Sequence, residues 1–113
     1  MLDGPKELLY YQTAGGKWPF WEWVLNLNDS KTRRTVLNRL ERFAEGNPGH
    51  WRFVGQGIFE LKIYWGPGYR VYFGCEGQHM IIVLIGGDKS TQEKDIYEAQ
   101  KNWQDYKRRS YGA

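Results

Sequence analysis

The sequence has very few of the side chains that form disulfides and metal sites. It contains one cysteine, Cys75, and two histidines in 113 residues. A single cysteine cannot form an internal disulfide, which is typical of proteins in the reducing cytoplasm. Two histidines and one cysteine are also too few for an ordinary structural zinc site. We therefore expect a cytoplasmic protein with no bound metal and no cofactor.

Long apolar runs are missing as well. The longest extends from Met80 to Ile85, whereas a membrane-spanning helix needs about 20 apolar residues. The first residues lack the basic and apolar regions of a signal peptide. We therefore expect no membrane partner. The length and the mean hydropathy of −0.72 fit one globular domain over residues 1–113.

Aromatic and basic residues, in contrast, are abundant. Aromatics make up 17% of the chain, and 16 Lys and Arg against 13 Asp and Glu give a net charge of +3. This composition suits a polyanionic partner, because cations neutralise phosphates while aromatic rings stack on bases. Many soluble domains have a similar charge without binding nucleic acid, so charge alone does not decide between the two interpretations.

The amino-terminal half predicts one strand and two helices. Residues 6–13 are rich in Leu and Tyr and favour a strand. Pro19 suits the first turn of a helix that continues through Leu25. A second helix is expected over residues 31–45, where apolar residues recur at helical spacing. The Gly- and Pro-rich segment that follows predicts a loop containing His50, Trp51 and Arg52.

From Ile58 onward, apolar and polar residues alternate with a period of two, which predicts strands. Turns at residues 66–68 and 76–78 divide this region into three strands. Ser90 and Glu93 fit a capping box at the start of a last helix. The sequence thus predicts an α+β fold with an N-terminal strand, a helical hairpin, a three-stranded antiparallel meander and a C-terminal helix.

The predicted hairpin around residues 66–68 gathers polar side chains. A three-residue loop would pair Trp65 with Tyr69, and alternation then places one polar set on the face opposite the core. That set is Glu60, Lys62, Tyr64, Arg70 and Tyr72. Two cations and two phenols on one sheet face suit phosphate and base binding. The alternative is a solvated face on which Lys62 and Arg70 only flank Glu60.

Residues 86–91, with the sequence Gly-Gly-Asp-Lys-Ser-Thr, are a second candidate site. Backbone N–H groups at a helix start favour an anion, and Lys89 would add a full positive charge. The segment is not a P-loop, because Asp88 stands where that motif has glycine. An ordinary capped connection between a strand and a helix explains the same residues equally well.

Three blocks of the sequence resemble the RelE/ParE toxin superfamily, and its HigB-like addiction module killer branch in particular. They are residues 57–63, the Gly-Tyr-Arg-Val-Tyr-Phe block at 68–73, and residues 84–92 with Gly-Gly-Asp-Lys-Ser-Thr-Gln. The resemblance covers residues 17–104. It implies a RelE-like fold and the toxin of a type II toxin–antitoxin pair. Many members cleave mRNA in the ribosomal A site, whereas the ParE branch poisons DNA gyrase.

The resemblance also implies roles for single residues. Arg70 matches the phosphate-binding arginine of RelE-type sites, and Lys62 matches one of their two strand lysines. Glu60 occupies the other lysine position. Lys89 matches the lysine-containing loop, where Ser90 replaces the arginine that follows in RelE. Tyr97 is a displaced substitute for the C-terminal tyrosine of that enzyme.

These considerations predict a metal-independent, ribosome-dependent mRNA endoribonuclease, with gyrase poisoning or binding through an antitoxin alone as alternatives. The expected partners are an antitoxin with a helix-turn-helix domain, the ribosome and its mRNA, and operator DNA bound through the antitoxin. The proposed roles divide into catalysis by Lys62, Arg70 and Lys89, RNA binding by Trp51, Arg52, Tyr64 and Tyr72, and proton transfer by Glu60, His50 or Tyr97.

Overall fold

Within residue 2 and residues 4–110, which the computed structural model describes, the chain forms a five-stranded mixed sheet and three α-helices. The sheet order is β1-β5-β4-β3-β2. Along the chain the elements are β1 (Glu7–Tyr10), α1 (Pro19–Leu25), α2 (Ser30–Ala44), β2 (His50–Gly55), β3 (Ile58–Ile63), β4 (Tyr69–Glu76), β5 (Met80–Asp88), the 3-10 turn η1 (Lys89–Thr91) and α3 (Gln92–Ser110). The α+β fold class, compatible with a RelE-like fold, is therefore confirmed.

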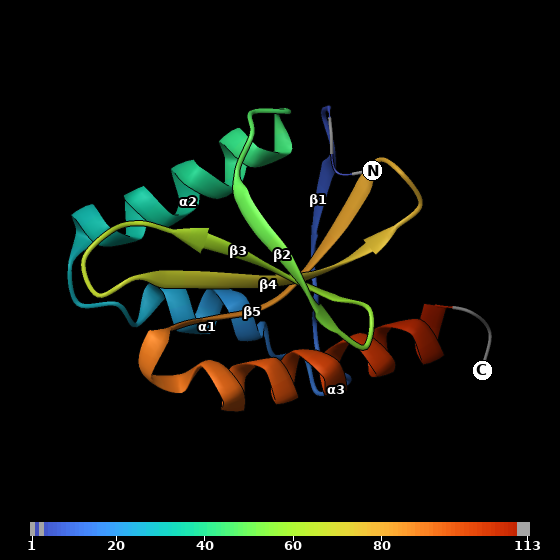
Figure 1. Cartoon of the computed structure of the whole chain (residues 1–113). Coiled ribbons are helices and arrows are strands. Elements are labelled where there is room, and N and C mark those ends of the chain that lie inside the picture. The colour runs from blue at the N-terminus through green and yellow to red at the C-terminus, as the bar shows by residue number, and fades with distance from the viewer. Residues whose placement is uncertain (1, 3, 111–113) are drawn as a thin grey trace.

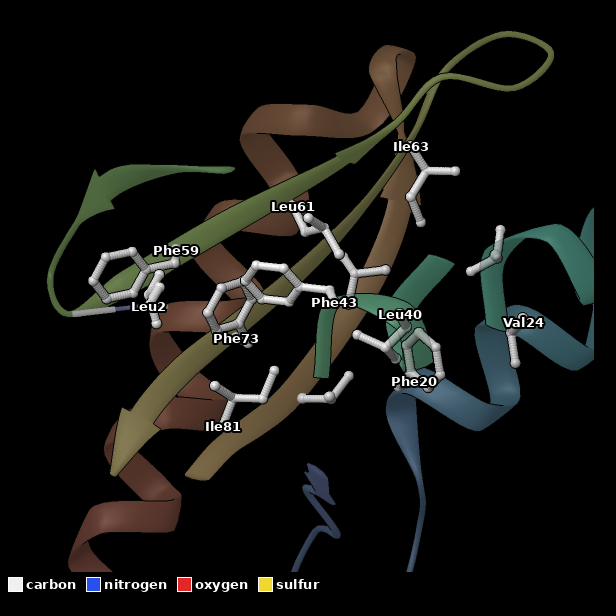
Figure 2. Packing of buried hydrophobic residues seen from close by; sticks show 13 residues of the cluster. Leu2, Phe20, Val24, Leu40, Phe43, Phe59, Leu61, Ile63, Phe73 and Ile81 are labelled. Carbon is white, nitrogen blue, oxygen red and sulfur yellow. The ribbon is translucent and has the colours of Figure 1, made fainter. Parts of the chain in front are cut away.

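The two faces of the sheet are covered by different helices. Figure 1 shows α2 on one side of the strands and α3 on the other. Phe20 of α1 and Leu40 of α2 pack with Val71 and Phe73 of β4 in one core, part of which is seen in Figure 2. Ala99 and Trp103 of α3 pack with other side chains of the sheet in a second core. The polar residues of interest lie on the face that α3 covers in part.

The segment expected to be a loop around His50 is instead the edge strand β2. It pairs antiparallel with β3, so the meander has four strands and not three. The Gly- and Pro-rich stretch does end α2, but the residues directly after it, His50–Gly55, form the strand. The turn to β3 has positive φ at Gly55, Gln56 and Gly57, and two of these residues are glycines that adopt this conformation freely.

The hairpin between β3 and β4 has a longer loop than predicted. Ile63 pairs with Tyr69 and Lys62 with Arg70, so five residues, 64–68, form the connection. The predicted pairing of Trp65 with Tyr69 is wrong. The difference leaves the alternation unchanged, so the polar residues of the two strands still share one face.

Two further boundaries differ from the prediction. The strand β1 ends at Tyr10. The strand β5 continues through Asp88, so Gly86 and Gly87 are strand residues and not a loop at a helix start. Asp88, not Ser90, caps the following turn, because its side chain accepts a hydrogen bond from the Ser90 backbone N–H.

Gly86 lets α1 approach the sheet closely. A Cβ atom built at this position would lie 2.3 Å from ring atoms of Trp23. We expect Gly86→Ala to destabilise the fold by about 2 kcal/mol, because the indole must shift out of a packed core. Urea unfolding measures this difference. Gly15→Ala is the control, since a Cβ there meets only Thr13 Oγ1 at 3.9 Å. Equal stability of the two variants would contradict the packing of Trp23 on Gly86.

Candidate functional site

Two adjacent rows of side chains cross the face that α3 partly covers. Strand pairing aligns His50, Lys62 and Arg70 in one row, which we call the site row. It also aligns three residues that lie two positions away along each of these strands, and we call them the anchor row. The anchor row consists of Arg52, Glu60 and Tyr72. Directly paired residues of neighbouring strands point to the same face, so the two rows lie side by side.

The carboxylate of Glu60 holds the anchor row together. Glu60 is 0% exposed. Its Oε1 accepts a hydrogen bond from Arg52 Nε at 2.9 Å, and its Oε2 accepts from Tyr72 Oη at 3.0 Å and from Gln92 Nε2 at 2.9 Å. Gln92 is the first residue of α3. A buried carboxylate requires such donors, so Glu60 ties three elements together.

The hydrogen bonds also set the ionisation of Glu60 and Tyr72. Burial by itself would raise the pKa of Glu60, but the hydrogen bonds from Arg52, Gln92 and Tyr72 outweigh it and hold the pKa below its ordinary value. Burial and the Glu60 charge raise the pKa of Tyr72, so this phenol stays protonated and donates. Tyr72 is buried, and the structure does not present its ring to a base.

Arg70 of the site row reaches toward Glu60 of the anchor row and has hydrogen-bond donors without a partner among the described residues. Its Nε is 3.5 Å from Glu60 Oε2, which makes an ion pair. The residue is 8% exposed, and its Nε and Nη1 are buried without a hydrogen-bond partner among the described residues. Buried N–H groups in proteins are normally satisfied. Because these two atoms are closed to solvent, only the remaining part of the guanidinium fork can donate to a ligand outside.

The structure brings the three predicted catalytic residues together around one hollow, which we call the β3–β4 hollow. Its volume is about 460 Å³. Lys62, Arg70 and Lys89 line it, and none of the described carboxylates does. The loop between β3 and β4 adds Tyr64 and Trp65, and β4 adds Tyr69. Three cations and three aromatic rings around one open hollow suit a phosphate with an attached base.

His50 and Tyr64 form a pair at the edge of this hollow. Tyr64 Oη and His50 Nδ1 are hydrogen-bonded, and the ring centroids lie 5.3 Å apart. Tyr64 is 62% exposed and lines the hollow itself. His50 is the direct neighbour of Lys62 in the site row. The pair therefore places two groups capable of proton transfer beside the cations.

Other predicted site residues lie elsewhere. Trp51 pairs with Leu61 and contacts Phe59, on the opposite face of the sheet from Lys62. Tyr97 is exposed on α3, where Lys101 Nζ lies 5.5 Å from its ring centroid. Arg52 is engaged by Glu60, although more than half of its side chain is exposed. Neither Trp51 nor Tyr97 lines the β3–β4 hollow.

Sequence reasoning missed two contributors to the site. Gln92 supplies a hydrogen bond to Glu60, and Tyr69 lines the hollow. The proximity of Gln92 to Glu60 depends on how α3 docks, which sequence alternation does not report. Alternation assigned Tyr69 to the apolar face of its strand. Only the pairing of Ile63 with Tyr69 places it next to the hairpin loop, at the rim of the β3–β4 hollow.

Among the described residues, the structure contains no cluster of three or more His, Cys, Asp or Glu side chains that could hold a metal ion. No helix in the same part of the chain is both long enough and apolar enough to cross a membrane. Burial raises the pKa of the Cys75 thiol, which favours the protonated and unreactive form.

Comparison with known proteins identifies the family. The profile of the family described as "Phage derived protein Gp49-like (DUF891)" matches residues 22–105. This chain belongs to the Gp49-like family. An uncharacterized protein of Haemophilus influenzae (strain ATCC 51907 / DSM 11121 / KW20 / Rd) is 42% identical over 81 residues, which cover 72% of this chain and 82% of that relative. The Gp49-like family is similar to RelE and to addiction module killer proteins, which confirms the predicted resemblance at this level.

Membership in the Gp49-like family suggests the toxin of a toxin–antitoxin system and implies an antitoxin partner. The catalytic residues, the target and the HigB-like branch stay predictions.

The role of Glu60 leads to a test of stability against pH. Because its pKa is lowered by folding, its contribution to stability is complete above the ordinary pKa of glutamate and is lost as pH falls through the lowered value. We expect Glu60→Gln to cost about 3 kcal/mol near neutral pH, since Arg70 loses its buried counter-ion. Urea unfolding of both proteins should show this gap narrowing as the solution is acidified.

Glu98→Gln is the matched control, because Glu98 pairs with Lys101 only at the surface, at 3.7 Å. Its cost should be below about 0.5 kcal/mol. A gap between wild type and Glu60→Gln that does not change with pH would show that Glu60 is not the buried anion described above.

Proposed function

We propose that this Gp49-like protein is a toxin that cleaves mRNA on the ribosome without a metal ion. The observation that supports this proposal is the β3–β4 hollow, where Lys62, Arg70 and Lys89 surround a space that no carboxylate of the described residues lines. The positive charge of three cations around one space favours an anionic ligand there. An RNA phosphate meets these requirements.

The proposed reaction uses the substrate's own 2′-OH as the nucleophile. The 2′ oxygen attacks the adjacent phosphorus, and the bond from phosphorus to the 5′ oxygen breaks. The products are a 2′,3′-cyclic phosphate and a free 5′-OH. Negative charge grows on the phosphoryl oxygens in the transition state. Arg70 is assigned to two of these oxygens because a guanidinium donates in a fork, and Lys62 and Lys89 add charge from either side.

Proton transfer is assigned to the pair of His50 and Tyr64. The 2′-OH must lose a proton and the leaving 5′ oxygen must gain one. Glu60 is the less suitable base, because it is buried and already accepts three hydrogen bonds. A histidine ring nitrogen can accept or donate a proton, and the hydrogen-bonded partner of His50, Tyr64, reaches the hollow.

The ribosome is expected to supply what the isolated protein lacks. Aligning a 2′-OH with the phosphorus atom contributes several kcal/mol to catalysis, and free RNA is flexible. We therefore propose that free RNA is cut poorly and that cleavage occurs in translated reading frames. Tyr64, with its exposed ring, is the residue best placed to stack on a base.

The antitoxin that the family implies is proposed to be a helix-turn-helix protein whose acidic segment covers the β3–β4 hollow. Opposite charge favours this location, because the lining contains three cations. Operator DNA would be bound through the antitoxin and not by this chain directly. The proposed place of action is the cytoplasm.

Lys62→Ala tests the assignment with little risk to the fold, because Lys62 is only half-buried and has no ion pair among the described residues. Loss of a charge that stabilises the transition state should lower ribosomal cleavage by on the order of 100-fold. Arg70→Ala is a less suitable variant, since it would also leave Glu60 without its buried partner. The measurement is mRNA cleavage and growth arrest after induced expression, with DNA breaks counted in the same cells.

Lys17→Ala is the control, because Lys17 is an exposed loop residue that lines none of the hollows described here. Full activity of a folded Lys62→Ala protein would remove Lys62 from the site. Gyrase-linked DNA breaks with unchanged mRNA would instead establish the gyrase alternative.

A further inference from the structure

A second hollow adjoins the β3–β4 hollow, and we call it the α2–β3 hollow. Its volume is about 290 Å³. Arg39 and Arg42 of α2 line one side, and Leu61 and Lys62 of β3 line the other. Lys62 also lines the β3–β4 hollow, so the two spaces meet at this residue, although its neighbour Leu61 faces the opposite side of the sheet. The two hollows are therefore neighbours at the same end of β3.

A further contact connects the two regions along α2. Trp65 lines the β3–β4 hollow and also a third, shallower depression that Arg39 and Arg42 border. Both arginines are exposed. The surface from Arg70 to α2 therefore has two residues that each border two of these spaces, Lys62 and Trp65.

The charged side chains that are known to line the two hollows are all positive. Within residue 2 and residues 4–110, no carboxylate lines the α2–β3 hollow or the β3–β4 hollow. Glu41 and Glu45 border only the third depression, and neither makes an ion pair with Arg39 or Arg42 among the described residues. The guanidinium groups of Arg39 and Arg42 are therefore free to bind an external anion.

We infer that the α2–β3 hollow binds a second phosphate of the RNA strand, next to the phosphate held at Arg70. This inference rests on the proposed function. A single strand has one phosphate per nucleotide, so a strand with one phosphate at Arg70 presents another nearby as it leaves the β3–β4 hollow. Lys62 lies at the junction, and Arg39 and Arg42 offer donor forks beyond it.

RNA fits this surface better than an acidic protein segment does. Aromatic residues accompany the cations, since Tyr64 lines the β3–β4 hollow and Trp65 lines both that hollow and the depression bordered by Arg39 and Arg42. Such a combination of rings and positive charges is typical of single-stranded nucleic acid binding, where bases stack while phosphates follow the cations. A peptide with carboxylates would use the charges alone.

The test measures binding of a fluorescent RNA of about eight nucleotides. Its 2′-O-methyl groups remove the nucleophile, so binding is observed without cleavage. The variant Arg39→Gln/Arg42→Gln should bind about tenfold more weakly at low salt, and its salt slope should fall by about 0.7 for one lost phosphate contact. Lys17→Gln/Arg34→Gln removes the same charge from exposed positions outside both hollows and should bind within about twofold of wild type.

The outcomes separate this inference from the proposed function when the same proteins are assayed for cleavage on translating ribosomes. Equal binding by the two double variants, with ribosomal cleavage intact, would overturn the second phosphate site alone. Wild-type protein that binds no RNA but still cleaves on the ribosome would also overturn the second site alone, whereas protein that does neither would overturn both. Binding that depends on Arg39 and Arg42, without any ribosomal cleavage, would support the phosphate site and overturn the nuclease.

A poly-glutamate peptide of equal charge is the competing probe. Tighter binding of this peptide than of the RNA, with the same loss in Arg39→Gln/Arg42→Gln, would make the hollow a site for an acidic protein segment. That result would overturn the inference.

Discussion

Glu60 places a carboxylate at 0% exposure between the sheet and α3, where an isolated charge would be costly. The chain compensates with hydrogen bonds from β2, β4 and α3 and with the nearby guanidinium of Arg70. Each donor comes from a different element, so satisfying this one ion fixes how those elements meet. Removing the ion would loosen the docking of α3 and the position of Arg70 together.

The same interaction explains why the functional face is positive. The anchor row uses its negative charge internally, on Arg52 and on one side of Arg70. The site row beside it keeps Lys62 and the remaining donors of Arg70, and Lys89 joins them from the turn before α3. A buried anion thus holds a cation at the edge of a hollow that contains no anion of its own. This separation of charge suits phosphate chemistry, where any nearby carboxylate would repel the substrate.

Much of this arrangement could be predicted from the sequence because strand alternation is a local property. Alternation placed Glu60, Lys62, Arg70 and Tyr72 on one face, and an error in the length of the hairpin loop did not disturb that assignment. The helices α2 and α3 followed from apolar spacing for the same reason, although Asp88 is the cap where Ser90 was expected. The blocks around Arg70 and Lys89 also supported the family, which the profile match confirms.

The rest depended on contacts between distant segments. Alternation cannot say whether a helix covers a face, so Glu60 and Tyr72 were expected to be accessible and are buried. Alternation also cannot detect a strand that lacks an alternating pattern and is recognised only by its pairing with a neighbour. This is why β2, which pairs with β3, was expected to be a loop. With β2 in place, Trp51 falls on the opposite face from Lys62.

The chemistry of the RNA ends tests the central claim most directly. Purified protein is added to a reconstituted translation reaction with one defined mRNA, and both new ends are characterised. The account predicts a 2′,3′-cyclic phosphate on the upstream fragment and a 5′-OH on the downstream fragment, and both should disappear when initiation is blocked. Downstream fragments with a 5′-phosphate would indicate attack by water and not by the 2′-OH. That result, or an intact mRNA, would contradict the account.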